Sequence, residues 1–203
     1  MINICILTYI FNIGVGARKR VEPVKNKDQI AEVERLLRQH NSSPIYGDLW
    51  VFLNQTAARV GDALRLRYTD FNHIEGNVLN LKEQKTGKIR SIMLTTKALE
   101  LVAQRRADNP VHEYLFEVDS NRAKGKPISR VTVSAKFKEA GDMLNLHIAA
   151  HSPRKNLGYH AIKRGVSLPT LTKLYGHSSQ AATLAYCGIM EKDVEDVFQA
   201  IDY

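Results

Sequence analysis

Apolar residues recur with a helical period along most of this chain. Over residues 28–40, Ile30, Val33, Leu36 and Leu37 form a stripe, with acidic residues early and basic residues late. A stripe with this spacing favours a helix, and the order of charges complements the helix dipole. The pattern predicts an amphipathic helix over 28–40.

Further segments carry a helical pattern or its capping residues. We expect helices over residues 45–58, 60–67, 95–107, 129–145, 153–164, 168–175, 179–186 and 191–201. Ser129 is placed to cap one of them, and Thr95 or Thr96 another. Pro153 suits a first helical turn, and Gly165 is expected to end the same helix.

The period changes in the middle of the chain. Short apolar runs predict strands at residues 71–74, 78–81 and 89–94. The turns between them are Glu75-Gly76-Asn77 and Lys85-Thr86-Gly87. The predicted fold class is therefore α+β and mainly helical, with a small three-stranded antiparallel sheet.

Composition and charge narrow the class of partner. The chain has 203 residues, 44% of them hydrophobic, and 29 Lys and Arg against 21 Asp and Glu, a net charge of +8. Such a chain suits one domain with a substantial core. The basic excess favours a nucleic acid as the partner, because Lys and Arg release counterions from phosphates; an ordinary basic surface is the alternative.

Cys5 and Cys187 are too few for a disulfide framework and indicate a reducing compartment.

Residues 1–27 are interpreted as an N-terminal extension. The apolar stretch over 2–16 is interrupted by Asn3 and Asn12 and is shorter than the roughly 20 residues of a membrane span. The basic cluster at 18–20 follows this stretch, whereas a signal peptide begins with positive charge. We expect no membrane partner for this segment, which either packs as a strand or stays loose.

Six residues in short motifs fit the cleavage of a phosphodiester. They are Arg59, Lys85, His151, Arg154, His177 and Tyr186. Their motifs are T-A-A-R-V-G-D (56–62), E-Q-K-T-G-K (83–88), H-S-P-R (151–154) and the stretch from G-H-S-S to T-L-A-Y (176–186). Cleavage needs a nucleophile, cations around the phosphoryl oxygens and a proton donor for the leaving oxygen. Arginine suits the second task because its planar fork binds two oxygens and keeps its proton.

Two of these motifs are predicted to lie at the ends of helices. His151 and Arg154 are three residues apart at a predicted helix start, so both can point at one phosphate beside the positive end of the helix. The glycine before His177 can end a helix, and Ser178 or Ser179 can cap the next one.

In these motifs and their order, residues 28–190 resemble the catalytic domain of tyrosine recombinases, the phage-integrase family. The resemblance implies that Tyr186, nine residues after His177, attacks the scissile phosphate held by Arg59, His151, Arg154 and His177. A 3′-phosphotyrosyl link would form and a 5′-hydroxyl would leave, without metal or other cofactor.

The resemblance also assigns the proton donor. Lys85 would protonate the leaving oxygen, with Lys82 and Lys88 as rival candidates. The chain departs from the family pattern at Ala57 and Ala58, which replace a usual glycine. Pro153 and Tyr175 stand where the family commonly has leucine.

The implied partner is double-stranded DNA. Cations predicted to contact its phosphates are Lys88, Lys124, Lys126, Arg130, Lys136 and Lys155, with Lys138, Lys163 and Arg164 nearby. The family implies a homo-oligomer, a tetramer on DNA, in the cytoplasm of a bacterium, associated with the nucleoid in a phage or mobile-element context. The segment 191–203 would carry a helix that docks on a neighbouring subunit or on its own domain.

Alternatives to a site-specific recombinase or integrase remain open. The same cleavage chemistry serves a type IB topoisomerase that relaxes DNA, and the same fold could act as a non-catalytic DNA-binding module. About 27 residues precede the first matching helix, too few for the separate DNA-clamping domain usual in the family. We therefore expect either a stand-alone recombinase of the short invertase type, or part of a longer integrase.

Overall fold

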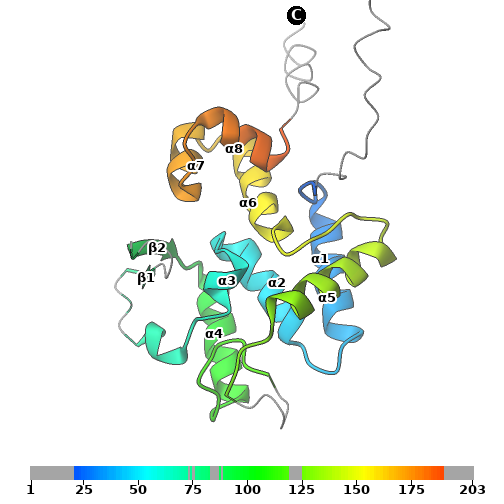
Figure 1. The fold of residues 1–203 in the computed structure, drawn as a ribbon, viewed down its shortest axis with the longest axis vertical. Coiled ribbons are helices and arrows are strands. Elements are labelled where there is room, and N and C mark those ends of the chain that lie inside the picture. Colours follow the sequence, from blue (N-terminus) through cyan, green and yellow to red (C-terminus); the bar gives the residue numbers. More distant parts are fainter. Residues whose placement is uncertain are drawn as a thin grey trace, which may run out of the picture.

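The protein is described by a computed structural model that covers residues 21–189, except residues 73, 75, 83–86, 88 and 119–124. Helices and one hairpin make up the described part (Figure 1). The elements in chain order are α1 (Lys27–Gln39), α2 (Ile45–Thr56), α3 (Val60–Ala63), the 3-10 helix η1 (Tyr68–Phe71), β1 (Val78–Lys82), β2 (Ile89–Met93), α4 (Thr96–Asp108), α5 (Arg130–Met143), α6 (Ser152–Lys163), α7 (Leu168–Tyr175) and α8 (Gln180–Cys187).

Helix α2 is the centre of the fold. It packs against α1, α3, α4, α5 and α6, and its apolar sequence leaves almost no residue exposed. Trp50 meets Phe137 of α5 edge to face at 5.2 Å between ring centroids, and Phe52 meets Phe116 at 5.6 Å. A helix that is apolar on all sides belongs in a core, and this burial explains why the other helices surround α2.

A smaller apolar cluster lies apart from the main core. Its buried members are Ala57, Leu171, Tyr175 and Cys187, with Tyr186 packed against them. It joins the end of α2 to α7 and α8, which lie together at one end of the molecule with α6 beneath them (Figure 1). This cluster supports the candidate site described below.

The predicted caps are found at helix starts. The hydroxyls of Thr95, Ser129 and Ser179 accept hydrogen bonds from the backbone N–H groups three residues later, at 3.2, 3.0 and 3.1 Å. Thr95 and not Thr96 therefore caps α4, and Ser179 and not Ser178 caps α8. Pro153 lies in the first turn of α6, as its sequence predicted.

The predicted three-stranded sheet is wrong. Among the described residues the sheet has β1 and β2 alone, antiparallel with Val78 opposite Met93 and Lys82 opposite Ile89. The first expected strand, at 71–74, is replaced in part by η1. The carboxylate of Asp70 accepts the backbone N–H of Arg67 at 2.8 Å, and this local bond stabilises a helical turn where the apolar residues suggested a strand.

The helix expected over 60–67 ends at Ala63. Leu66 and Tyr68 instead pair with a distant segment: Leu115 donates its N–H to Leu66 at 2.8 Å, and Tyr68 donates its N–H to Glu113 at 3.0 Å. This pairing draws the backbone out of the helix before residue 67.

No helix in the described part of the chain is both long and apolar enough to cross a membrane.

Candidate active site

The end of α2 forms one side of the site. Ala57 follows α2 in the left-handed conformation, with φ of 52° and ψ of 22°, which costs a residue other than glycine about 1 kcal/mol. Its carbonyl oxygen accepts a hydrogen bond from Nη1 of Arg154. Arg59 follows as the extended N-cap of α3 and is exposed. The turn that carries Arg59 is therefore joined directly to Arg154.

Arg154 is held from several directions on α6. Its side chain is buried, at 4% exposed, and its Nη2 donates to the carbonyl oxygen of Tyr175 at 3.2 Å. Its guanidinium carbon lies 4.5 Å from the centroid of the Tyr175 ring. The Tyr175 hydroxyl donates back to the carbonyl of Arg154 at 2.9 Å. These contacts orient the guanidinium before any ligand binds.

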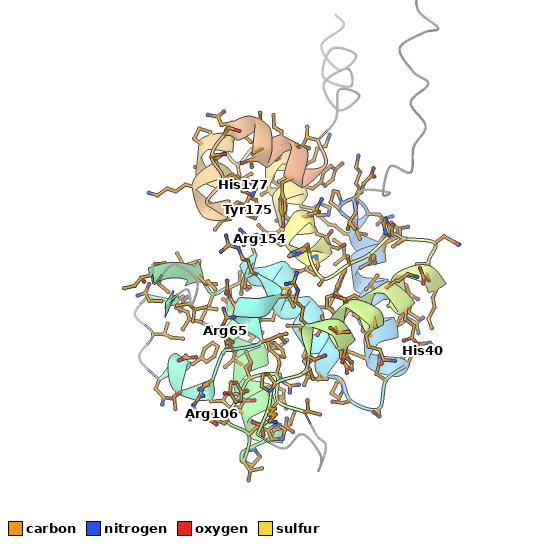
Figure 2. The ribbon with its side chains drawn as sticks, viewed as in Figure 1. His40, Arg65, Arg106, Arg154, Tyr175 and His177 are labelled. Carbon is orange, nitrogen blue, oxygen red and sulfur yellow. The ribbon has the colours of Figure 1, made fainter. Side chains whose placement is uncertain are left out.

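Three rings meet where α7 passes into α8. The ring centroids of Tyr175 and His177 are 5.3 Å apart and stacked, and those of His177 and Tyr186 are 5.0 Å apart. The rings of Tyr175 and Tyr186 are 5.4 Å apart. Gly176 makes the tight turn between α7 and His177 with φ of 65°. Figure 2 shows Arg154, Tyr175 and His177 close together between α7 and α3.

Tyr175 and Thr183 belong to this site, although the sequence did not single them out for it. Tyr175 stood out only as a replacement for leucine, yet it touches Arg154, His177 and Tyr186. Thr183 is completely buried, and its hydroxyl lies 3.1 Å from Nδ1 of His177. Its position one helical turn before Tyr186 was the signal available in the sequence.

Positive charge dominates around the histidines. Desolvation lowers the pKa of His151, and the charges of Arg130, Arg154, Lys155 and Arg59 lower it further. Nη2 of Arg130 lies 3.4 Å from Nε2 of His151. A histidine whose pKa lies below 6.5 is neutral at pH 7.

The same cations act on His177 and Tyr186. Desolvation followed by the charges of Arg154 and Arg59 lowers the pKa of His177. Burial raises the pKa of Tyr186, while Arg154, by its charge and a hydrogen bond, and Arg59 oppose that rise. Tyr186 therefore keeps its proton near neutral pH. The fixed cations can bind an anion such as a phosphate and stabilise negative charge that develops on it.

Five of the predicted catalytic residues come together in the structure, namely Arg59, His151, Arg154, His177 and Tyr186. Contacts join Arg154, His177 and Tyr186, and the effect of Arg59 on the pKa of His151, His177 and Tyr186 places its charge among them. Lys85 lies outside the described residues.

A family model now adds to this geometry. The model described as the phage integrase family matches residues 28–192, most of the chain. The chain belongs to the phage integrase family.

Curated relatives agree in sequence over the same region. The tyrosine recombinase XerA of Pyrococcus furiosus is 28% identical over 173 residues, which are 83% of this chain and 59% of the relative. A protein of Sinorhizobium fredii named putative integrase/recombinase y4qK is 31% identical over 138 residues, 67% of this chain and 44% of the relative. The chain thus spans about half the length of these curated relatives.

Solved structures share the fold. A XerA recombinase superposes with a TM-score of 0.68 at 16% identity, over 95% of this chain and 68% of the other. A lambda integrase, in a dimer bound to a COC′ core site, superposes with a TM-score of 0.62 at 21% identity, over 83% of this chain and 49% of the other. The α+β, mainly helical fold predicted from the sequence is therefore confirmed as the tyrosine recombinase fold, with two described strands where three were expected.

In this member of the phage integrase family, the cations predicted to contact DNA differ in exposure and in ion pairing. Lys126 and Arg130 are exposed, and Lys136 forms an ion pair with Glu139 at 2.8 Å. Lys88 and Lys124 lie outside the described residues.

Lys155, which we predicted to contact DNA phosphates, is buried in the structure. It is 8% exposed, and its ammonium donates to the carbonyl of Val21 at 2.7 Å. The ammonium also lies 5.1 Å from the centroid of the Tyr186 ring. Contacts from residue 21 and from α8 cover it, and the local sequence does not indicate either. Lys155 therefore packs inside the site and is not a surface cation.

No residue set suited to a metal ion accompanies the site in the part of the chain that the structure describes. Groups of three or more His, Cys, Asp or Glu side chains that could hold a metal are absent there. Cys187 is fully buried, and burial raises the pKa of its thiol to about 11. It is a packing residue of α8 and remains a thiol near neutral pH.

Proposed function

We propose that this member of the phage integrase family is a tyrosine-type DNA recombinase or integrase, which cleaves and rejoins double-stranded DNA. The observation that carries the proposal is the position of Tyr186. Its ring touches His177 and Tyr175, and the charges of Arg154 and Arg59 act on its hydroxyl. A phenol among fixed cations suits attack on a bound phosphate diester.

In the proposed reaction, a phosphate of DNA binds between Arg59 and Arg154. The bond between Oη of Tyr186 and phosphorus forms as the bond from phosphorus to the 5′ oxygen breaks. The phenol loses its proton and the leaving oxygen gains one, so one ester replaces another and no ATP is needed. The reverse attack by a 5′-hydroxyl, from the same or a partner duplex, rejoins a strand and frees Tyr186.

The roles of the remaining residues are part of the proposal. His151 and His177 contact the non-bridging oxygens, and Lys85, or its rivals Lys82 and Lys88, supplies the proton to the leaving oxygen. Arg130 and Lys126 are exposed and contact neighbouring phosphates. Lys136 and Lys124 are assigned the same task on the sequence argument.

Partners and location follow from the same proposal. One of the similar structures is a lambda integrase dimer bound to a COC′ core site, which supports a homo-oligomer on DNA, a tetramer when two duplexes exchange strands. The DNA of a bacterium, or of a phage or mobile element in it, lies in the cytoplasm, so we place the protein there with the nucleoid. The helix expected over 191–201, proposed to dock between subunits, lies outside the described residues.

The nucleophile is tested by substituting Tyr186. Wild-type protein incubated with a nicked suicide substrate is expected to form a covalent adduct, and Tyr186→Phe is expected to form none, because phenylalanine has no oxygen to attack phosphorus. Denaturing electrophoresis and mass spectrometry of the labelled peptide measure the adduct.

Tyr159→Phe is the matched control, since Tyr159 is a buried tyrosine of α6 that packs under Lys25 and Lys163. It should keep the adduct. An adduct in Tyr186→Phe would show that another residue is the nucleophile. If the wild-type protein forms the adduct and relaxes supercoiled DNA but yields no recombinant junctions, the topoisomerase-like alternative is favoured. If it binds DNA but forms no adduct, the DNA-binding module is favoured.

A further inference from the structure

A chain of hydrogen bonds runs from His177 into the packing between α7 and α8. Nδ1 of His177 lies 3.1 Å from Oγ1 of Thr183, and that hydroxyl lies 3.0 Å from Oγ1 of Thr172. Thr172 donates to the carbonyl oxygen of Leu168, one turn earlier in α7, at 2.8 Å. The chain thus ends at a group that can only accept.

Two backbone carbonyls favour one direction for the chain of hydrogen bonds. The hydrogen of Thr172 goes to Leu168, so Thr172 accepts from its neighbour. The hydrogen of Thr183 goes to Thr172, or to the carbonyl of Ser179 at 3.2 Å. In both arrangements the hydroxyl hydrogens point away from His177. With the hydroxyls of Thr172 and Thr183 donating to the backbone carbonyls of Leu168 and Ser179, a hydrogen on Nδ1 of His177 makes its contact with Thr183 a hydrogen bond as well. The Nδ1–H tautomer therefore satisfies more of these contacts than the Nε2–H tautomer does.

We propose that Thr183, supported by Thr172, is a positioning residue that holds His177 as the Nδ1–H tautomer. In the neutral ring Nε2 then bears a lone pair, which repels a phosphate oxygen. His177 can donate from Nε2 only after it binds a second proton. The contact with phosphate rests on the proposed function, whereas the tautomer itself is a property of the protein without DNA.

The groups around His177 make this second proton depend on the ligand. Arg154 of α6 and Arg59 before α3 both bear positive charge, and the rings of Tyr175 on α7 and Tyr186 on α8 are uncharged. Desolvation disfavours an imidazolium at His177, and the two arginines disfavour it further until an anion lies between them. A DNA phosphate offsets the repulsion from the arginines, so binding of DNA and uptake of a proton by His177 are linked.

The tautomer is measured directly by the ¹⁵N and ¹H shifts of the His177 ring in DNA-free protein, at a pH above the reference value of about 6.5. The wild-type ring is expected to show Nδ1–H. Thr183→Val should move it toward Nε2–H, because valine leaves Nδ1–H without an acceptor in a buried place. Thr183→Ser should restore Nδ1–H. An Nε2–H ring in the wild type overturns the proposal whether or not any variant folds.

Thr172→Val is the matched control. It removes the outer hydroxyl, but Thr183 can still donate to Ser179, so the Nδ1–H tautomer should remain. An equal change of tautomer in Thr172→Val and Thr183→Val would mean that the packing of α7 on α8 orients the ring, and the assigned role of Thr183 would be wrong.

The pH profile of suicide-substrate cleavage separates positioning from packing. Wild-type cleavage should fall about tenfold per pH unit above the pKa of DNA-bound His177, as expected for loss of one essential proton. Thr183→Val should cleave more slowly at its optimum but keep its rate to higher pH, because a neutral Nε2–H ring can donate. A uniform loss at every pH would overturn the proposal. Absence of any adduct from the wild type would refute the proposed function, while the ring spectrum would still test the tautomer.

Discussion

Gly158 lets α6 approach the helix that carries Tyr186. A Cβ atom at this position would lie 2.4 Å from Sγ of Cys187 and 2.6 Å from the hydroxyl of Tyr175. The Tyr175 hydroxyl donates to the carbonyl of Arg154, and its ring lies against His177. At the scale of single residues, the absence of a side chain at 158 therefore permits the contacts that orient the site.

Gly158→Ala is expected to lower the free energy of unfolding by about 1–3 kcal/mol, the usual cost of overpacking a core. It should also slow adduct formation, since Tyr175 must move and Arg154 and His177 with it. Denaturant unfolding and the suicide-substrate assay measure the two effects. Gly61→Ala is the control for stability, because its Cβ would meet only Nη1 of Arg65 at an ordinary 3.9 Å. Equal stability of the two variants would contradict the close packing inferred at Gly158.

At the scale of elements, a buried carboxylate links three helices. Asp48 of α2 accepts Nη1 of Arg38 from α1 and Nη1 of Arg105 from α4, both at 2.6 Å. Arg105 is 4% exposed and also donates to the carbonyl of Leu115 at 2.7 Å. Removing one partner of a buried pair leaves the other charge without compensation.

Asp48→Asn is expected to lower the free energy of unfolding by about 3 kcal/mol, because Arg105 would keep its charge in the core. Chemical denaturation followed by circular dichroism measures the loss. The control is Asp142→Asn, which removes the carboxylate of the exposed ion pair with Lys138 and should cost about 0.5 kcal/mol or less. A small loss in Asp48→Asn, comparable with that of the control, would show that Asp48 does not hold α1, α2 and α4 together.

For the whole molecule, the excess of positive charge is concentrated partly in the site. Arg59 and Arg154 lie there with His151 and His177, and desolvation, followed by the positive charges, lowers the pKa of both histidines. His160, which contacts the carbonyl of Val24, also has a lowered pKa, mainly through desolvation. The folded protein therefore binds these protons less readily than the unfolded chain.

The free energy of unfolding should consequently fall as the pH falls. The histidine pKa values in the folded protein lie below their unfolded value of 6.5. At a pH between the folded and unfolded pKa values, the unfolded chain binds more protons than the folded protein does. Acidification therefore stabilises the unfolded state relative to the folded state. Denaturant unfolding from about pH 7 to about pH 5 measures the slope. A variant with His151→Gln and His177→Gln should show a shallower slope. Stability that stays constant or rises on acidification would contradict this electrostatic account.

Local pattern predicted the helices well and the sheet less well. The periods of α1, α2 and α4 to α8 and the caps at Thr95, Ser129 and Ser179 depend on neighbours within one turn, which the sequence displays. The expected strand at 71–74 failed because the bond from Arg67 to Asp70 competes with an apolar run that suits either structure. The burial of Lys155 could not be predicted, since Val21, whose carbonyl binds its ammonium, is 134 residues away in the chain.

The sequence by itself determined the helical elements, the basic charge and the order of the motifs that hold Arg59, His151, Arg154, His177 and Tyr186. Those features are local or additive along the chain. Only the tertiary structure decided how these side chains act on one another. Arg154 is anchored on a carbonyl 97 residues away, and Nδ1 of His177 lies beside the hydroxyl of Thr183, which in turn contacts Thr172 of another helix. Distances between remote residues determine hydrogen bonds and pKa values, and the fold alone supplies those distances.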